Sequence, residues 1–329
     1  MALDGDRRAA LERARALTLL RDHFAVDVDT AEITTAPFGV AVQHGDRAWV
    51  VSMSDDLAAL GGVLVWLDRR APVEADLVFD HNAGVHARRA EVLAPECRVW
   101  AVDDTRVERA EPAAIPPPLR RPDGVSHLEA ILIDAGLEVV CEDGIVRGEL
   151  AGLEVARIVE GGQGPVLEAG VGRFDREAGA LLHAGRTSAE AVAEVVAQVR
   201  PHRTRGALSH AINRLARERW LRSELVSGSG GIRVSLPTLA EPIPPRRNLL
   251  EVSPACLLGD DEGRRVLFAC SVGMDLGLVP ALADQVRVHA PDELRLVVPP
   301  RDRLALLERL VSRLGIPATV LSTDPPWVE

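Results

Sequence analysis

Two stretches rich in proline and glycine interrupt the chain and constrain its fold more than any other feature. Residues 110–123 (AEPAAIPPPLRRPD) contain five prolines. No regular element is expected there, because the proline ring fixes φ and removes a backbone donor. The second break, 227–247, begins SGSGG and ends LAEPIPPRR, which is turn and linker chemistry. The sequence therefore predicts an N-terminal module at 1–110, a linker at 111–123, a middle domain at 124–226, a linker at 227–250 and a C-terminal module at 251–329.

The first and last segments share one expected order of elements: a β-hairpin, a helix, a strand, a helix and a strand. Their spacings agree, since Val50 and Leu77 are 27 positions apart and their counterparts Phe268 and Leu296 are 28 apart. We therefore expect an α/β fold in which two similar βαβαβ-containing, Rossmann-like modules flank an α+β middle domain. The alternative is a coincidence between common units of stereotyped length. Two similar modules could pair around a pseudo-two-fold axis within one chain.

The charged residues exclude several classes of function. All 38 basic side chains are Arg, because the chain contains no Lys. Schiff-base chemistry, pyridoxal-phosphate anchoring and a Walker-type phosphate loop all need a Lys amine and are therefore excluded. A net charge of −11 argues against a protein whose whole surface coats nucleic acid or an anionic membrane.

The apolar residues and the cysteines indicate the cellular compartment in which the protein is expected. Hydrophobic residues make up 47% of the chain, as in a folded soluble protein, and no run is long enough to span a membrane. The four Cys lie far apart and form no CxxC pair. This spacing favours buried free thiols in a reducing compartment over a zinc site. We therefore expect a cytoplasmic protein without membrane contact, of an oligomeric state that the sequence does not indicate.

Two acidic side chains of the middle domain form a candidate metal site. Glu154 and Glu168 lie in strand-like runs joined by a turn sequence at 161–164, which would place the two strands side by side. Carboxylates on adjacent strands can hold a divalent cation such as Mg²⁺ or Mn²⁺. The alternative is that these acids form a cross-strand ion pair with Arg157.

The order of a helix followed by strands, over about residues 125–183, resembles that of the restriction-endonuclease-like nucleases. That family carries an acid on one strand and an acid-x-Lys motif on the next. Glu154 matches the first acid and Glu168 the second, whereas Gly170 occupies the Lys position. The resemblance implies a divalent-metal-dependent hydrolase with a degenerate core, because no Lys exists anywhere in the chain to replace the missing one.

Residues 172–178 (GRFDREA) mark an expected change from strand to helix. Asp175 is expected at the helix cap, where a carboxylate suits the helix macrodipole, and it is also a candidate catalytic acid. Arg173 and Arg176 would lie at a strand end, where ligand sites often occur, so both are candidate anion-binding residues.

Residues 200–222 depart most strongly from the average composition. They read RPHRTRGALSHAINRLARERWLR and contain seven Arg and one Glu, so they carry +6 in a chain of −11. We expect an Arg-rich helix that contacts phosphate or carboxylate groups. The alternative is internal neutralisation by acids elsewhere in the chain. The candidate anion-binding residues of this segment are Arg203, Arg205, His210, Arg214 and Arg217.

Three functional interpretations remain open. The favoured one is a non-catalytic binding or interaction factor that contacts a polyanion, either nucleic acid or a nucleotide, through residues 200–222, and that could also have a protein partner. The second is the metal-dependent hydrolase centred on Glu154 and Glu168. The third is a purely structural scaffold. Binding is favoured over hydrolysis because the Lys required by the nuclease pattern is missing.

Overall fold

The computed structural model describes residues 2–94, 96–103, 106–162, 164–182, 185–243 and 252–328. Within these ranges the protein is an α/β structure with three mixed or antiparallel sheets, none of which closes into a barrel. The chain forms two compact units. The first consists of residues 1–115, 274–290 and 304–319, and the second consists of 116–273, 291–303 and 320–329.

The first unit contains a six-stranded sheet whose strands lie in sequence order. The two inner neighbours β3–β4 and β4–β5 are parallel, and the remaining pairs are antiparallel. A doubly wound sheet reverses its strand order at a switch point, and this sheet does not. Its strands are β1 (Glu32–Ala36), β2 (Gly39–His44), β3 (Arg47–Ser52), β4 (Glu74–Phe79), β5 (Cys97–Asp103) and β6 (Arg106–Arg109).

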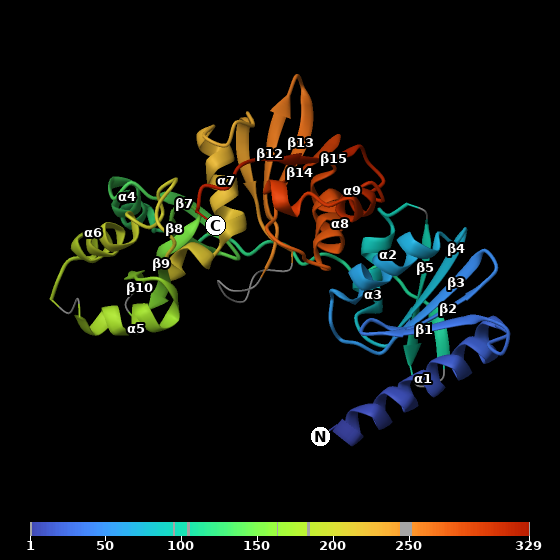
Figure 1. Cartoon of the computed structure of the whole chain (residues 1–329). Helices are drawn as coiled ribbons and strands as arrows, with labels where there is room; N and C mark the ends of the chain where they lie inside the picture. The colour runs from blue at the N-terminus through green and yellow to red at the C-terminus, as the bar shows by residue number, and fades with distance from the viewer. Residues whose placement is uncertain are drawn as a thin grey trace. The chain divides into compact units, whose positions relative to one another are not determined.

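Helices cover both faces of this sheet (Figure 1). Helix α1 (Ala2–Phe24) contacts β2 and β3, and its Leu19 and Leu20 pack with Val40 and Val51 in one apolar cluster. Alternate strand residues point to opposite faces, so the other face is left for the crossover helices that follow β3 and β4. These helices are α2 (Ala59–Arg70) and α3 (Ala83–Ala90).

Helices α2 and α3 pack against α8 (Leu278–His289) and α9 (Ala305–Val311), which also belong to the first unit. The contact is close, because a Cβ added at Gly61 would lie 1.6 Å from the Leu276 carbonyl oxygen. Asp284 of α8 is fully buried and accepts hydrogen bonds from the Nε atoms of Arg88 and Arg89, both at 2.8 Å. The first unit is therefore built from segments nearly 200 positions apart in sequence.

The second unit contains a four-stranded antiparallel sheet in the order β10-β9-β8-β7. Helices α4 (Ser126–Asp134) and α6 (Ser188–Val199) pack against it, and α5 (Gly172–Leu182) contacts β10. The predicted linker at 111–123 contains no helix or strand, as expected from its prolines. The strands are β7 (Glu138–Glu142), β8 (Ile145–Leu150), β9 (Leu153–Gly161) and β10 (Gly164–Ala169).

The third sheet has five strands in sequence order, and helix α7 (Arg217–Ser227) packs against β12 and β13 through Trp220, Leu221 and Leu225. Strand β11 lies inside the predicted linker at 227–250, and residues 244–250 of that linker lie outside the described residues. The strands are β11 (Ser235–Ala240), β12 (Ala255–Asp261), β13 (Arg264–Cys270), β14 (Glu293–Val298) and β15 (Ala318–Ser322). The short helices η1 (Ala211–Arg214) and η2 (Pro300–Asp302) complete the described elements.

Candidate functional site

The two candidate metal-binding acids lie on adjacent strands and share an Arg side chain. β9 and β10 pair antiparallel across the predicted turn, with Gly161 opposite Gly164. The Arg176 Nη1 atom donates to Glu154 Oε1 at 2.9 Å, and Arg176 Nε lies 3.7 Å from Glu168 Oε2. The structure therefore places a guanidinium group between the two carboxylates.

Each of the two acids also pairs with a second Arg. Arg147 Nε donates to Glu154 Oε2, and Arg157 Nε donates to Glu168 Oε2, each at 2.9 Å. Arg157 and Glu168 are directly opposite in the β9–β10 register, which is the cross-strand ion pair considered as the alternative above. In the described part of the chain, no three or more His, Cys, Asp or Glu side chains gather into a group that could hold a metal ion.

Gly170, which occupies the Lys position of the nuclease pattern, has no room for a side chain. Its φ is +140°, and an added Cβ would lie 2.8 Å from the backbone nitrogen of Arg176. The start of α5 therefore approaches the end of β10 so closely that only glycine fits there. The Arg of α5, and no residue at position 170, supplies the cation beside the two acids.

A cavity of about 540 Å³ opens beside this ion-pair network, along β10 and between α5 and the start of α6. Its charged lining consists of four Arg and two Glu, which is a net positive charge within a chain of −11. These residues are Arg157, Arg173, Arg176, Arg186, Glu168 and Glu177. The predicted Arg173 and Arg176 and the predicted Glu168 therefore meet at one cavity.

Arg176 is the most deeply buried of the four Arg that line the cavity. Its side chain is 9% exposed, and its Nε atom is buried without a hydrogen-bond partner in the described structure. Burial lowers the pKa of Arg176 from its ordinary value; Glu154 opposes this shift and Arg157 adds to it. A negatively charged ligand in the cavity would favour the charged form of this guanidinium.

The other side chains at this cavity are held by local contacts. Arg173 pairs with Glu177 one helical turn later at 2.7 Å, and Arg186 pairs with Glu194. Both Arg side chains are largely exposed, so these pairs contribute little stability and exchange easily. Asp175, the third candidate catalytic acid, accepts a hydrogen bond from the Val171 backbone N–H at 2.6 Å, which is a local role at the start of α5.

The helix predicted at 200–222 is wrong in its extent. Residues 201–206 are turns and bends, η1 covers 211–214, and α7 begins only at Arg217. Two backbone conformations prevent a continuous helix, because Gly206 has a φ of +78° and Ala216 a φ of +46°. His210 caps η1, where its Nδ1 accepts a hydrogen bond from the Ile212 N–H, and its ring stacks on that of His202 at 3.8 Å.

The Arg side chains of this segment have different environments. Arg203 is buried, with its guanidinium 4.1 Å from the Trp220 ring, and burial lowers its pKa to about 9.

The other three candidate Arg of the segment are less buried. Arg205 forms an ion pair with Glu224 at 2.6 Å. Arg217 donates to the Asn213 carbonyl at 2.9 Å. Arg214 is exposed. The described structure therefore brings these candidates neither into one row nor into the β10 cavity.

Sequence reasoning did not single out the acids that neutralise α7. Arg219 and Arg222 are buried and both pair with Glu142 of β7 and Glu149 of β8. For these two Arg, internal neutralisation is what the structure shows. The available signal was the coincidence of a +6 segment and an acidic pair of strands in one predicted domain.

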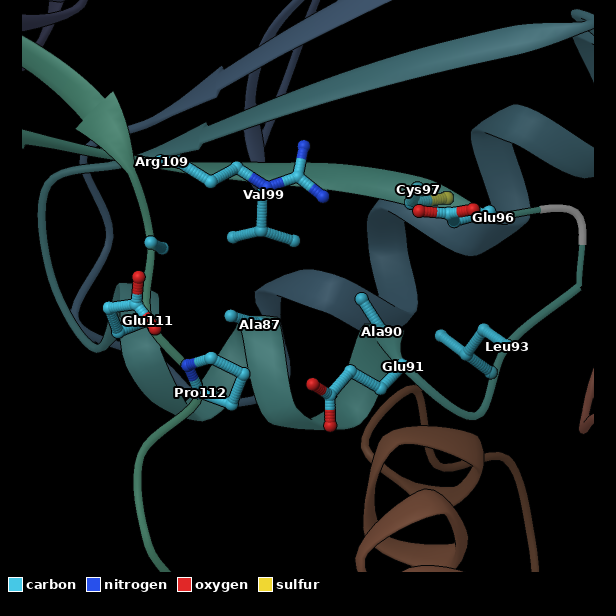
Figure 2. A pocket seen from close by; sticks show the side chains of 11 residues that line it. Ala87, Ala90, Glu91, Leu93, Glu96, Cys97, Val99, Arg109, Glu111 and Pro112 are labelled. Carbon is cyan, nitrogen blue, oxygen red and sulfur yellow. The ribbon is translucent and has the colours of Figure 1, made fainter.

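A second cavity, of about 420 Å³, lies in the first unit beside α3, β5 and β6 (Figure 2). Glu91, Glu96, Glu111 and Arg109 supply its charged lining. Cys97 also lines it, but burial raises the pKa of its thiol to about 11, so it is no thiolate nucleophile at neutral pH. None of the site residues predicted from the sequence lies here.

Comparison of the chain with known proteins identifies no relative: no protein family, curated protein or solved structure matches it. Among the described helices, none is both long enough and apolar enough to cross a membrane.

Proposed function

We propose that this protein is a non-catalytic binding protein for a negatively charged ligand, which it holds in the cavity formed by β10, α5 and the start of α6. The observation that carries the proposal is Arg176, a nearly buried guanidinium whose Nε atom makes no hydrogen bond in the described structure and which lies at a cavity lined by three further Arg. Leaving a buried donor unsatisfied costs about 1–3 kcal/mol, which an anionic acceptor would recover.

The proposed ligand is an anion, as expected from the sequence. The proposed binding site, however, is the β10 cavity and not residues 200–222. The segment 200–222 offers fewer free cations than its composition indicates, because Arg203, Arg219 and Arg222 are buried in contacts within the protein. Nucleotides, nucleic acids and acidic proteins all remain members of the ligand class.

Hydrolysis at Glu154 and Glu168 is less well supported than binding. A divalent cation between the two carboxylates would have to displace the Arg176 guanidinium and break its 2.9 Å hydrogen bond to Glu154. The guanidinium already neutralises the acids there, and a buried charge that loses its partner is costly.

Anion titration of the full chain tests the proposed site. Binding of polyphosphate, an oligodeoxynucleotide and polyglutamate is measured by calorimetry from 50 to 300 mM salt. We expect at least one polyanion to bind with an affinity that falls as salt rises. Arg173→Gln and Arg186→Gln should each weaken binding about three- to tenfold, because each removes one charged contact.

Arg214→Gln is the matched control, because this Arg is exposed but lies away from the cavity. Its affinity should equal that of the wild type. If Arg214→Gln weakens binding and the two cavity variants do not, the site belongs to 200–222 and the cavity proposal is wrong. If no polyanion binds at 50 mM salt, the binding function itself is wrong.

We also propose that the stretches from α1 to β5 and from α7 to β15 are copies of one module. Both follow the order of a helix, three strands, a helix, a strand, a helix and a strand. The Ala94 N–H donates to the Arg313 carbonyl at 2.6 Å, and the Gly315 N–H donates to the Val92 carbonyl at 2.8 Å. A single shift in residue number, added in one stretch and subtracted in the other, converts the donor and acceptor positions of the first bond into the donor and acceptor positions of the second.

A cytoplasmic location remains a proposal of the same kind. All four Cys are free, and three of them are buried. Free buried thiols persist most readily in a reducing compartment.

A further inference from the structure

The cavity of the proposed function runs along an unpaired sheet edge. β10 is the first strand in the order β10-β9-β8-β7, so only one of its two sides is bonded to a neighbouring strand. The Gly170 N–H donates to the Val155 carbonyl at 2.8 Å and so extends the β9–β10 ladder. Bonded and non-bonded pairs alternate in antiparallel strands, so the backbone groups of Leu167 and Ala169 point away from β9.

No backbone group of another described segment bonds to these outward N–H and C=O groups of Leu167 and Ala169. Both residues line the cavity. Pro165, which has no N–H, precedes them on β10 and limits the bonding edge to about one short strand. The cavity therefore combines outward-facing backbone donors and acceptors with a positively charged lining.

The two walls of the cavity differ in chemistry. α5 and α6 both contact β10, and Figure 1 shows them on opposite sides of this strand. On one wall lie Arg157 and Arg176, beside Glu168. On the other, Ala169 belongs to an apolar cluster against which Leu167 and Ala191 of α6 pack. A strand laid along this edge would point alternate side chains to the two walls.

We propose that the β10 edge accepts an extended acidic peptide as a fifth strand, with acidic side chains facing the Arg wall and small apolar side chains facing Ala191. Backbone bonds to Leu167 and Ala169 supply the pairing, and the Arg lining supplies selectivity for negative charge. This inference rests on the proposed function, since it names the ligand class for the same cavity.

The partner is a separate acidic polypeptide, and charge complementarity argues for it. Four Arg against two Glu in the lining favour a strand with acidic residues at every second position. An alternating strand of acidic and small apolar residues meets the requirements of both walls.

Fluorescence anisotropy of the full chain with a labelled seven-residue peptide tests the strand pairing. The peptide alternates glutamate and valine, and a second version has the same sequence with N-methyl groups on the amides that would face β10. N-methylation keeps the charge and removes the backbone donors. We expect the N-methylated peptide to bind at least tenfold more weakly than the unmodified peptide. We also expect the N-methylated peptide to leave the measured affinity for polyphosphate unchanged.

Hydrogen exchange supplies the second readout. The Leu167 and Ala169 amides should gain protection when the unmodified peptide binds, and Arg173→Gln should weaken the peptide about three- to tenfold. If both peptides bind equally with the same salt dependence, strand addition is overturned and the anion site stands. If these amides are protected in the free protein and the protection depends on protein concentration, a second copy occupies the edge and the acidic partner is overturned. If neither peptide nor any polyanion binds, the proposed function falls with it.

Discussion

At the scale of single residues, His86 links burial to pH sensitivity. Its side chain is fully buried on α3, its ring stacks on Phe79 at 4.0 Å, and neither ring nitrogen has a hydrogen-bond partner in the described structure. Burial, with a smaller contribution from Arg89, lowers its pKa to about 4. In the unfolded chain, His86 has its ordinary pKa near 6.5. Between pH 6.5 and pH 4 the unfolded state therefore binds a proton at His86 that the folded state does not bind. Through this residue, the free energy of unfolding does not change with pH above 6.5 and falls as the pH drops towards 4.

We predict that His86→Leu reduces the pH dependence of unfolding. Between pH 7.5 and 5.0 the wild type should lose about 2 kcal/mol of stability through this residue, and the variant should not. Urea denaturation at the two pH values measures the difference. His127→Gln, at an exposed position, should behave as the wild type. An unchanged loss in His86→Leu would show that His86 is not the group responsible.

At the scale of elements, α7 holds two layers of the second unit together. One side packs Trp220 and Leu225 against β12 and β13, and the other pairs Arg219 and Arg222 with the acids of β7 and β8. The helix lies close to the turn between β8 and β9. A Cβ added at Gly152 would lie 2.3 Å from the Arg219 carbonyl carbon.

We therefore predict that Gly152→Ala lowers the free energy of unfolding by more than about 2 kcal/mol, because it combines a positive φ with a backbone clash. Gly124→Ala is a matched control, since its φ is +73° against +74° for Gly152 and an added Cβ would meet nothing within 4 Å. It should cost only about 1 kcal/mol. Equal costs in urea denaturation would contradict the close approach of α7.

At the scale of the whole molecule, buried charge joins distant parts of the first unit. Asp284 bonds two Arg side chains about two hundred positions earlier in the chain. Asp284→Asn keeps the shape but leaves both buried guanidinium groups without a counter-charge. We expect a loss of about 3–5 kcal/mol in denaturant unfolding. Glu91→Gln removes the exposed pair with Arg287 and should cost under about 1 kcal/mol; similar losses in both would refute the role of burial.

Local patterns in the sequence were sufficient to predict much of the fold. The prolines at 110–123 correspond to a segment without regular structure. The expected helix and strands over about 125–183 correspond to α4 and β7 to β10, and the expected change from strand to helix at 172–178 corresponds to the start of α5. These predictions hold because backbone restriction and side-chain periodicity act over a few residues. The candidate residues Glu168, Arg173 and Arg176 also meet at one cavity, because they lie within ten positions of one another around the β10–α5 turn.

Tertiary structure decided which charges remain available for a ligand. The sequence alone determined the charge of residues 200–222, but Arg219 and Arg222 find their partners on β7 and β8, about 70 to 80 positions earlier. Likewise, the Arg176 guanidinium takes the place between Glu154 and Glu168 that the sequence assigned to a cation. Ion pairing depends on distance in space and on desolvation, and neither is encoded in the spacing of residues along the chain.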